Sequence, residues 1–355
     1  MAYTTIDNPG IYFNTKLYTG NGGTNAITGV GFQPDWVWLK RRDSSAAHYV
    51  WDVVRGAATQ LYPASASSED AGQTNGLSAF GSDGFTLGSD AGPNANSGTY
   101  ASWNWKAGGS ASSNSDGSIT SSVSASTTAG FSIVSFTGNG SAGATIGHGL
   151  GAVPQVYILK NRSSSAGWTS YFEPLGNTKF LQLDTTGAAG TATEAFNNTS
   201  PTSSVFSIGT DTSTNNNTDN FIAYCFAEKK GYSKFGSYTG NGNADGTFVY
   251  TGFAPTWVMV KRTNGTQDWN IFDAKRPGYN PADRKIEPNT SDTESGAGNS
   301  NQVDLLSNGF KRKGTGTGSN GSGDTYIYMA FAESPFTNSS GVPNNARWLC
   351  SYLLT

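Results

Sequence analysis

The sequence predicts an all-β protein built of three tandem antiparallel β-sandwich repeats of the jelly-roll kind, and three observations lead to this. Apolar residues lie in short aromatic and β-branched runs, separated by small polar residues and 46 glycines, a pattern typical of strands joined by many turns. No segment has the 3.6-residue periodicity of an amphipathic helix. Five sequence landmarks recur in the same order three times, which indicates one structural unit used repeatedly.

The first landmark is an aromatic residue followed by Thr-Gly-Asn-Gly. It reads YTGNG at 18–22, FTGNG at 136–140 and YTGNG at 238–242. The motif lacks the Gly-Lys-Ser/Thr ending with which a P-loop binds phosphate, so a structural turn is the better interpretation. Asn-Gly is the strongest short hairpin signal, because both residues tolerate positive φ. We therefore expect a positive-φ Asn-Gly turn near the start of each repeat.

The second landmark is a proline followed by a strand that is apolar on both faces. Proline has no N–H, which is harmless just before a strand. Because neither face of the strand is polar, we expect it to lie in the centre of a sandwich with both sides buried. The copies are Pro34 with 36–39, Pro154 with 156–159 and Pro255 with 257–260, each closed by a lysine (Lys40, Lys160 and Lys261).

The third landmark is a corner that carries an acidic residue, which is Asp52, Glu173 or Asp273. Arg55 and Arg276 follow the two aspartates by three residues. A glycosidase needs two carboxylates facing one sugar, whereas these three acids lie in three different repeats. We interpret all three as structural corners, capped by backbone or paired with arginine, and predict neither a catalytic residue nor an enzyme.

The last two landmarks are a Phe-centred strand and a final strand, joined by a loop rich in Gly, Asn and Ser. The three loops cover 89–98, 210–219 and 314–324. The predicted domains are repeat 1 (1–108), a Ser/Gly-rich linker (109–129), repeat 2 (130–231), repeat 3 (232–337) and a C-terminal tail (338–355). The alternating stretch 118–126 in the linker is able to add an edge strand, repeats 2 and 3 abut without a linker, and the apolar run 348–354 is expected to dock the tail.

Composition argues against several classes of function. The net charge is −3 and 13% of residues are charged, whereas a nucleic-acid-binding protein usually has clustered Lys and Arg. No apolar run approaches the roughly 20 residues of a membrane span. The N-terminus has neither the basic nor the apolar part of a signal peptide. Two cysteines do not form a disulfide framework.

No metal or cofactor site is predicted. His48 and His148 lie in different repeats and do not make a zinc set. Asp211, Asp219 and the asparagines at 215–217 offer oxygen ligands for calcium, but without the spacing of a known calcium loop.

Candidate binding residues lie in the variable loops. Trp168 and Trp269 stand outside the repeated strands, where an exposed ring can stack on a sugar. Loop asparagines can hydrogen-bond sugar hydroxyls. The predicted glycan-contacting residues are Trp168, Trp269, Asn94, Asn96, Asn215, Asn217 and Asn320.

Several segments together point to a family. They include FNTKLYTGNGGTNAITGVGFQPDWVWLKRR, YASWNWKAGG, GFSIVSFTGNGSAGATIGHGL, FIAYCFAEKKGYSKFGSYTGNG and YIYMAFAESPF. This text resembles a group of virion-associated proteins of tailed bacteriophages, especially marine ones. Members are described as tail-fibre, receptor-binding or other structural proteins with lectin-like, concanavalin A-type β-sandwich folds. The chain departs from a long tail fibre in having no N-terminal anchor, coiled-coil heptads or collagen-like stretch.

The resemblance implies a virion surface protein of the tail-fibre or receptor-binding type that contacts host surface glycans. Expected partners are other virion proteins and a host polysaccharide, with no nucleic acid and no membrane insertion, and a homotrimer is expected from the family. The expected location is the virion surface, after synthesis in the host cytoplasm. Two alternatives stay open, namely a capsid-decorating cement or head-fibre protein and a polysaccharide depolymerase.

Overall fold

One strand order recurs in three sheets of the computed structural model, which describes residues 3–296 and 298–343. Each sheet contains four strands of the repeat in one order, and all neighbours are antiparallel. The strand that leads into TGNG lies beside the final strand. The final strand lies beside the proline strand, and the proline strand lies beside the acid-corner strand. In this order they are β1 (Phe13–Thr19), β7 (Thr99–Trp105), β3 (Trp36–Arg41) and β4 (His48–Asp52) in repeat 1; β10 (Phe131–Thr137), β17 (Asn220–Phe226), β12 (Val156–Asn161) and β13 (Thr169–Phe172) in repeat 2; and β18 (Ser233–Thr239), β26 (Thr325–Pro335), β20 (Phe253–Arg262) and β21 (Asn270–Asp273) in repeat 3.

A smaller sheet containing the Phe-centred strand accompanies each of these sheets. The strand orders are β2 (Asn25–Thr28), β6 (Gly84–Leu87) and β5 (Leu77–Gly81) in repeat 1; β11 (Ala144–Gly147) and β16 (Val205–Ile208) in repeat 2; and β19 (Asp245–Tyr250), β25 (Gly309–Lys313) and β24 (Gln302–Leu306) in repeat 3. The all-β prediction is therefore confirmed.

The sheet of repeat 2 is extended at both edges. The predicted linker supplies β8 (Ser112–Asn114) and β9 (Ser121–Ser126), and β9 pairs with β10. The alternating stretch at 118–126 therefore joins the sheet as predicted, but β9 is not its edge strand, because β8 pairs with the other side of β9. On the other edge lie β14 (Lys179–Gln182) and β15 (Gly190–Thr191).

The remaining elements are short. They are the 3-10 helices η1 (Pro9–Ile11), η2 (Glu173–Leu175) and η3 (Gly298–Ser300), the single-turn helices α1 (Ala91–Asn94), α2 (Thr193–Phe196) and α3 (Thr212–Asn215), and a ribbon of β22 (Arg284–Lys285) and β23 (Ser295–Gly296). No helix of the described residues is long and apolar enough to cross a membrane. The predicted docking run 348–354 lies outside the described residues, as does Cys350.

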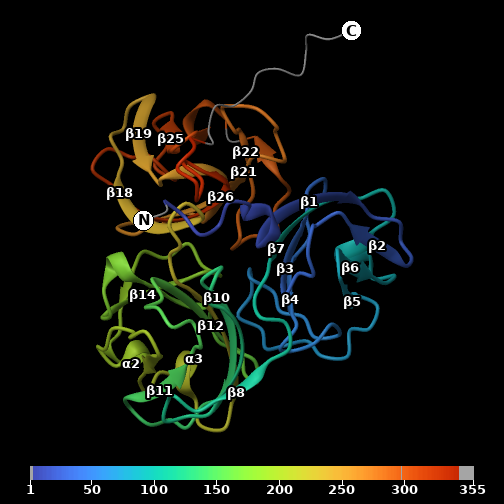
Figure 1. Cartoon of the computed structure of the whole chain (residues 1–355), viewed down its shortest axis with the longest axis vertical. Helices are drawn as coiled ribbons and strands as arrows, with labels where there is room; N and C mark the ends of the chain where they lie inside the picture. The colour runs from blue at the N-terminus through green and yellow to red at the C-terminus, as the bar shows by residue number, and fades with distance from the viewer. Residues whose placement is uncertain (1–2, 297, 344–355) are drawn as a thin grey trace.

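Each repeat has its own apolar core, and a further core lies where the three repeats meet. Successive residues of a strand face opposite sides of the sheet. In β3, Val37 and Leu39 join the core of repeat 1, whereas Trp36 and Trp38 join a central cluster that also contains residues of repeats 2 and 3. The strands predicted to be buried on both faces are buried in this way. Figure 1 shows the three repeats as three lobes around a common centre.

Aromatic rings from different repeats fill this centre. Trp36 stacks on Tyr224 of repeat 2 with ring centroids 4.5 Å apart, and Phe13 stacks on Phe331 of repeat 3 at 5.1 Å. Ring pairs of this kind add stability beyond the area that they bury. The richness in tryptophan is thereby explained by a core shared among three repeats.

Candidate functional site

A buried asparagine holds each TGNG turn. Asn94 Oδ1 accepts a hydrogen bond from the Asn21 amide (3.0 Å), and Asn94 Nδ2 donates to Asn21 Oδ1 (3.1 Å), Gly23 O (2.6 Å) and Gly88 O (2.7 Å). Asn215 and Asn320 make the same four kinds of bond in repeats 2 and 3. We call this arrangement the asparagine clasp.

The clasp corrects three of the predicted glycan contacts. Asn94, Asn215 and Asn320 are fully buried, so their amides cannot reach a ligand at the surface. Their hydrogen-bonding capacity is used by the turn and by the loop before the clasp. Asn96 and Asn217 are exposed beside the turns and stay predictions.

The turn itself differs in one respect from the expected hairpin. Gly22, Gly140 and Gly242 have φ of 70°, 66° and 65°, as expected, but the asparagines before them are not among the described residues with positive φ. Instead, Asn21 Oδ1 accepts a hydrogen bond from the Gly23 amide (2.9 Å). Gly20 is required for another reason, because a Cβ there would lie 2.2 Å from the carbonyl oxygen of Ala95.

Trp168 and Trp269 are buried at contacts between repeats, so the prediction that they form exposed stacking platforms is wrong. We call the contact between repeats 1 and 2 seam 1/2, the contact between repeats 2 and 3 seam 2/3, and the contact between repeats 3 and 1 seam 3/1. The Trp168 indole N–H donates to the carbonyls of Tyr62 (3.0 Å) and Ser65 (3.1 Å) across seam 1/2. The Trp269 indole donates to the Gln182 carbonyl (3.0 Å) across seam 2/3.

His48 occupies the position of these tryptophans in repeat 1. Its Nε2 lies 3.1 Å from the Glu287 carbonyl across seam 3/1, and its Nδ1 accepts from the Trp38 indole (3.0 Å). The signal that would have revealed this role is spacing, because His48, Trp168 and Trp269 each follow the strand-closing lysine by eight residues.

Those lysines also cross the seams. Lys40 Nζ donates to the carbonyls of Ala46 in its own repeat (3.0 Å) and of Ser291 in repeat 3 (3.2 Å). Lys160 reaches Ala66 of repeat 1, and Lys261 reaches Thr186 of repeat 2. All three lysines are fully buried, and this desolvation lowers the pKa of each to about 8.

Two of the three predicted acid corners form buried ion pairs. Asp52 Oδ2 accepts from Arg55 Nε at 2.6 Å and from the Tyr224 hydroxyl across seam 1/2 at 2.7 Å. Asp273 Oδ2 accepts from Arg276 Nε at 2.6 Å, and from the Trp103 indole across seam 3/1 at 3.0 Å.

In each aspartate corner the other carboxylate oxygen caps the backbone that follows. Asp52 Oδ1 accepts from the amides of Val54 (3.0 Å) and Arg55 (2.9 Å), and Asp273 Oδ1 bonds the two amides of its own corner in the same way. Glu173 differs, because it is exposed at the start of η2 and is followed three residues later by Gly176 instead of arginine.

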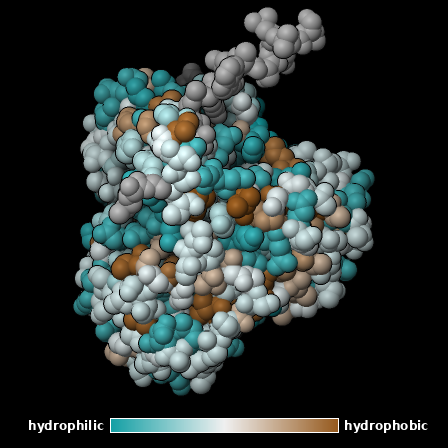
Figure 2. Space-filling view, in the orientation of Figure 1, coloured by the Kyte–Doolittle hydropathy of each residue, from teal (hydrophilic) through white to brown (hydrophobic). Residues whose placement is uncertain are grey.

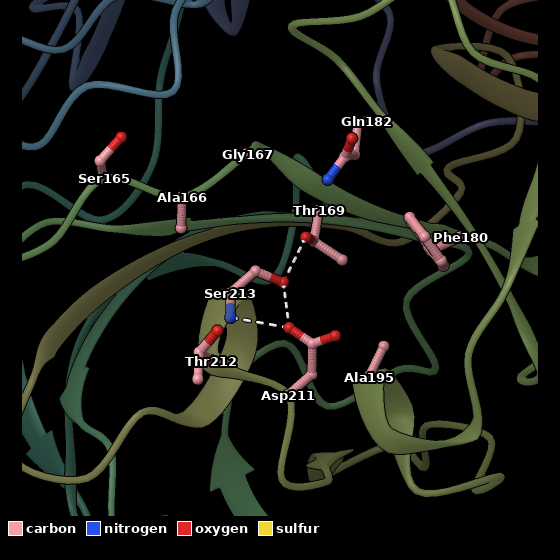
Figure 3. Close-up of a pocket in the computed structure, with 10 residues that line it drawn as sticks. All are labelled: Ser165, Ala166, Gly167, Thr169, Phe180, Gln182, Ala195, Asp211, Thr212 and Ser213. Carbon is pink, nitrogen blue, oxygen red and sulfur yellow. Dashed lines mark hydrogen bonds between the residues drawn. The ribbon is translucent and has the colours of Figure 1, made fainter.

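An open pocket of about 270 Å³ lies on repeat 2 and is the best candidate for a ligand site. It forms between the loop before β13, strand β14 and helix α3. Figure 3 shows the side chains around it, with the amide of Gln182 and the ring of Phe180 on one side and Asp211 opposite. The lining residues are Ser165, Ala166, Gly167, Thr169, Phe180, Gln182, Ala195, Asp211, Thr212 and Ser213.

The polar groups of the pocket are held in place by one another. Asp211 Oδ1 accepts from the Ser213 amide (2.7 Å) and hydroxyl (2.6 Å), and the Ser213 and Thr169 hydroxyls are 2.7 Å apart. Asp211 is also the N-cap of α3, which positions its carboxylate on the backbone. The sequence pointed to Asp211 only as an oxygen ligand for calcium, and it did not indicate Thr169, Phe180 or Gln182.

Repeat 1 closes the same place with two tyrosines. Strand register puts Tyr49 opposite Leu39, as Thr169 is opposite Leu159, and the Tyr62 carbonyl accepts the seam bond that Gln182 accepts in repeat 2. Tyr49 and Tyr62 contact each other with centroids 5.5 Å apart, and the Tyr49 hydroxyl lies against the backbone at Gly92. The pocket is therefore open in repeat 2 because Thr169 and Gln182 replace two aromatic rings.

The pocket has the chemistry of a binding site. One carboxylate, several hydroxyls and one amide can exchange hydrogen bonds with a polar ligand, and Phe180 offers an apolar surface. Its lining contains one carboxylate and no histidine, cysteine or lysine, so it lacks a pair of groups for general acid–base catalysis. The described residues contain no group of three or more potential metal ligands.

Comparison with known proteins gives a family. No curated protein and no solved structure matches the chain. Residues 8–335 match the family described as "Domain of unknown function (DUF7483)", and because this match covers most of the chain, the protein belongs to that family.

Proposed function

We propose that this protein is a non-enzymatic surface protein of a tailed-phage particle, of the tail-fibre or receptor-binding type, which binds a host surface glycan in the pocket of repeat 2. The observation that carries the glycan part is the lining of that pocket. Asp211, Thr169 and Gln182 offer both donors and acceptors around the ring of Phe180, and sugars present hydroxyls together with an apolar face.

The surroundings favour a neutral sugar. Asp211 is the charged residue of the lining, and Asp184 accepts a hydrogen bond from the Trp168 amide close by. No lysine or arginine lines the pocket to hold a carboxylate. A carboxylate-bearing sugar would therefore meet like charge.

The finer fold assignment belongs to the same proposal, namely that each repeat is a lectin-like β-sandwich. It is supported by the pairing of one four-stranded order with one smaller sheet in every repeat. The face in Figure 2 is mostly of intermediate to hydrophilic hydropathy, with small and separated apolar patches, which suits a protein that stays folded on the outside of a particle.

The depolymerase alternative has less support. That reaction needs two carboxylates about 5–10 Å apart in one groove. Asp52 and Asp273 are fully buried and paired with arginines, and Glu173 is exposed on a different repeat from both. Capsid decoration remains the second candidate, because the same repeats would serve on a head as well as on a tail.

The test of glycan binding is to close the pocket as repeat 1 does. We expect the wild-type chain to bind a neutral glycan of the host surface on an array and in calorimetry. The double change T169Y/S213G should abolish binding while leaving the thermal unfolding midpoint within about 2 °C, since repeat 1 combines a tyrosine with Gly92 at these two places. T199Y, at an exposed threonine outside the pocket lining, is the matched control and should bind normally.

Equal binding by T169Y/S213G and the wild type would rule out this pocket. The location on the particle is tested separately by antibody labelling in electron micrographs. Label at the tail agrees with receptor binding, whereas label on the head would favour capsid decoration.

A further inference from the structure

Repeat 3 buries an arginine without an acidic partner. Arg312 lies in β25 and is fully buried. Its Cζ is 4.9 Å from the centroid of the Phe272 ring, so the guanidinium lies over an aromatic face in the core of the repeat. No Asp or Glu of the described residues lies within ion-pair distance of it.

The hydrogen bonds of Arg312 involve one nitrogen only. Nη2 donates to the Asn301 carbonyl (2.9 Å) and to the Ser319 hydroxyl. Nε and Nη1 are both buried and have no hydrogen-bond partner among the residues that the structure describes. The Ser319 hydroxyl donates in turn to Asn301 Oδ1 (3.1 Å), so it accepts from Nη2 and donates elsewhere, and it does not serve Nε or Nη1.

Nearby hydroxyls are engaged as donors elsewhere. The Tyr238 hydroxyl donates to the Ser319 carbonyl (2.6 Å), and the Tyr326 hydroxyl donates to the Thr317 carbonyl (2.7 Å). These bonds hold the loop at 314–324 around the guanidinium. The surrounding side chains thus supply neither a negative charge nor an acceptor to Nε and Nη1.

The fold does not require an arginine here. Phe85, Phe206 and Phe310 are equivalent core residues, and two residues later come Leu87, Ile208 and Arg312 on the same face. Leucine and isoleucine are fully buried at this place in the other two repeats. Arginine does not lose its charge in proteins, and an unpaired buried charge is strongly destabilising.

We propose that the core of repeat 3 binds a small monovalent anion, of the chemistry of chloride, next to Nη1 of Arg312. The anion neutralises the guanidinium and accepts hydrogen bonds that no protein group accepts. Because the side chain is fully buried, the space beside it favours a halide over a larger carboxylate or phosphate. This site is independent of the pocket of repeat 2, so either proposal can fail alone.

The test compares chloride with gluconate at constant ionic strength. The thermal unfolding midpoint of the wild type should rise by about 1–2 °C for each tenfold increase in chloride above the dissociation constant, because a ligand bound only by the folded state stabilises it. R312L installs the residue of repeat 1 and should unfold at a midpoint that does not change with chloride. R284L, which removes an exposed arginine, is the control and should keep the full response.

A second measurement is independent of whether R312L folds. Crystals of the wild type soaked in bromide should give an anomalous peak within about 3.5 Å of the Arg312 guanidinium. The proposal is overturned if R312L and the wild type respond equally to chloride, or if the bromide-soaked crystals show only water at this place.

Discussion

Seam 3/1 and seam 2/3 share one backbone pattern and differ in their charges. In both, the strand-closing lysine donates to a carbonyl of the neighbouring repeat, and backbone N–H groups cross the seam. At seam 3/1, Arg42 makes a two-point ion pair with Glu294, which also contacts Arg276 of the Asp273 corner. At seam 2/3 the residues in the places of Arg42 and Glu294 are Thr263 and Ala189.

Chain connection does not account for the difference. Repeats 2 and 3 are joined by residues 227–232 alone, and repeats 1 and 2 by as few, residues 106–111, because β8 and β9 already belong to the sheet of repeat 2. Seam 1/2 nevertheless has a paired corner and an Arg162–Glu69 ion pair. The difference lies in the corners, since Arg55 and Arg276 follow the aspartates of repeats 1 and 3, whereas Gly176 follows Glu173 in repeat 2.

The largest expected effect comes from breaking the network at seam 3/1. D273A removes the carboxylate that binds Arg276 Nε, leaves Glu294 as the remaining acidic contact of this buried arginine, and leaves the Trp103 indole without an acceptor. We expect a loss of about 3–5 kcal/mol in the free energy of unfolding, measured with urea. E173A is the matched control at the exposed corner of repeat 2 and should change it by less than about 0.5 kcal/mol. Similar losses in both variants would show that the seams do not differ in this way.

The asparagine clasp should behave identically in all three repeats. N94A, N215A and N320A each remove the four hydrogen bonds that the three clasps share and leave buried backbone groups unpaired. We expect each to lower the free energy of unfolding by about 2–3 kcal/mol. If the three losses differed by more than about 1 kcal/mol, the repeats would not be equivalent in their interiors, and the contrast between seams would lose its meaning.

The repeated elements were predictable because local sequence determines them. The succession of strands along the chain, the buried proline strands and the acid corners with Arg55 and Arg276 follow from landmarks that recur in sequence, whereas the order of the strands within each sheet does not. The clasp and the seams were not predictable, because a buried Asn94 and an exposed Asn96 look alike in a polar loop. Trp168 also resembled a surface residue. The Tyr62 carbonyl that accepts its hydrogen bond lies about a hundred positions away in the sequence, so no local pattern indicates the contact. The pocket of repeat 2 exists because Thr169 and Gln182 stand where repeat 1 has two tyrosine rings. This difference becomes visible only when the structures of the two repeats are compared.

The seam lysines should make stability depend on pH. The folded pKa of Lys40, Lys160 and Lys261 is about 8, below the ordinary 10.5, so between these values the unfolded chain binds more protons. The free energy of unfolding should therefore rise from pH 8 to 10, by about 2 kcal/mol for each lysine. K261M should reduce the rise measured by urea unfolding by about a third. An equal reduction by K160M would indicate that the lysines act alike at charged and uncharged seams, and a flat profile in the wild type would contradict the lowered pKa values.

The smallest effect is expected from giving seam 2/3 the missing ion pair. The backbone contact that accompanies this ion pair at seam 3/1 is already present at seam 2/3. The Ala189 amide donates to the Thr263 carbonyl (2.8 Å), just as the Glu294 amide donates to the Arg42 carbonyl (3.0 Å). T263R and A189E together should stabilise the chain by about 0.5–1 kcal/mol beyond the sum of the single changes, as seen in a double-mutant cycle of urea unfolding.

A coupling energy near zero in that cycle would have a specific meaning. Glu294 and Glu69 each contact a second arginine, at 3.1 Å from Arg276 and 3.6 Å from Arg55. Repeat 2 has Gly176 at this point, with a φ of 77° that disfavours any side chain. The outcome would then show that the corner arginine, and not the pair across the seam, orients the glutamate, and that seam 2/3 cannot gain the network by exchanging surface charges alone.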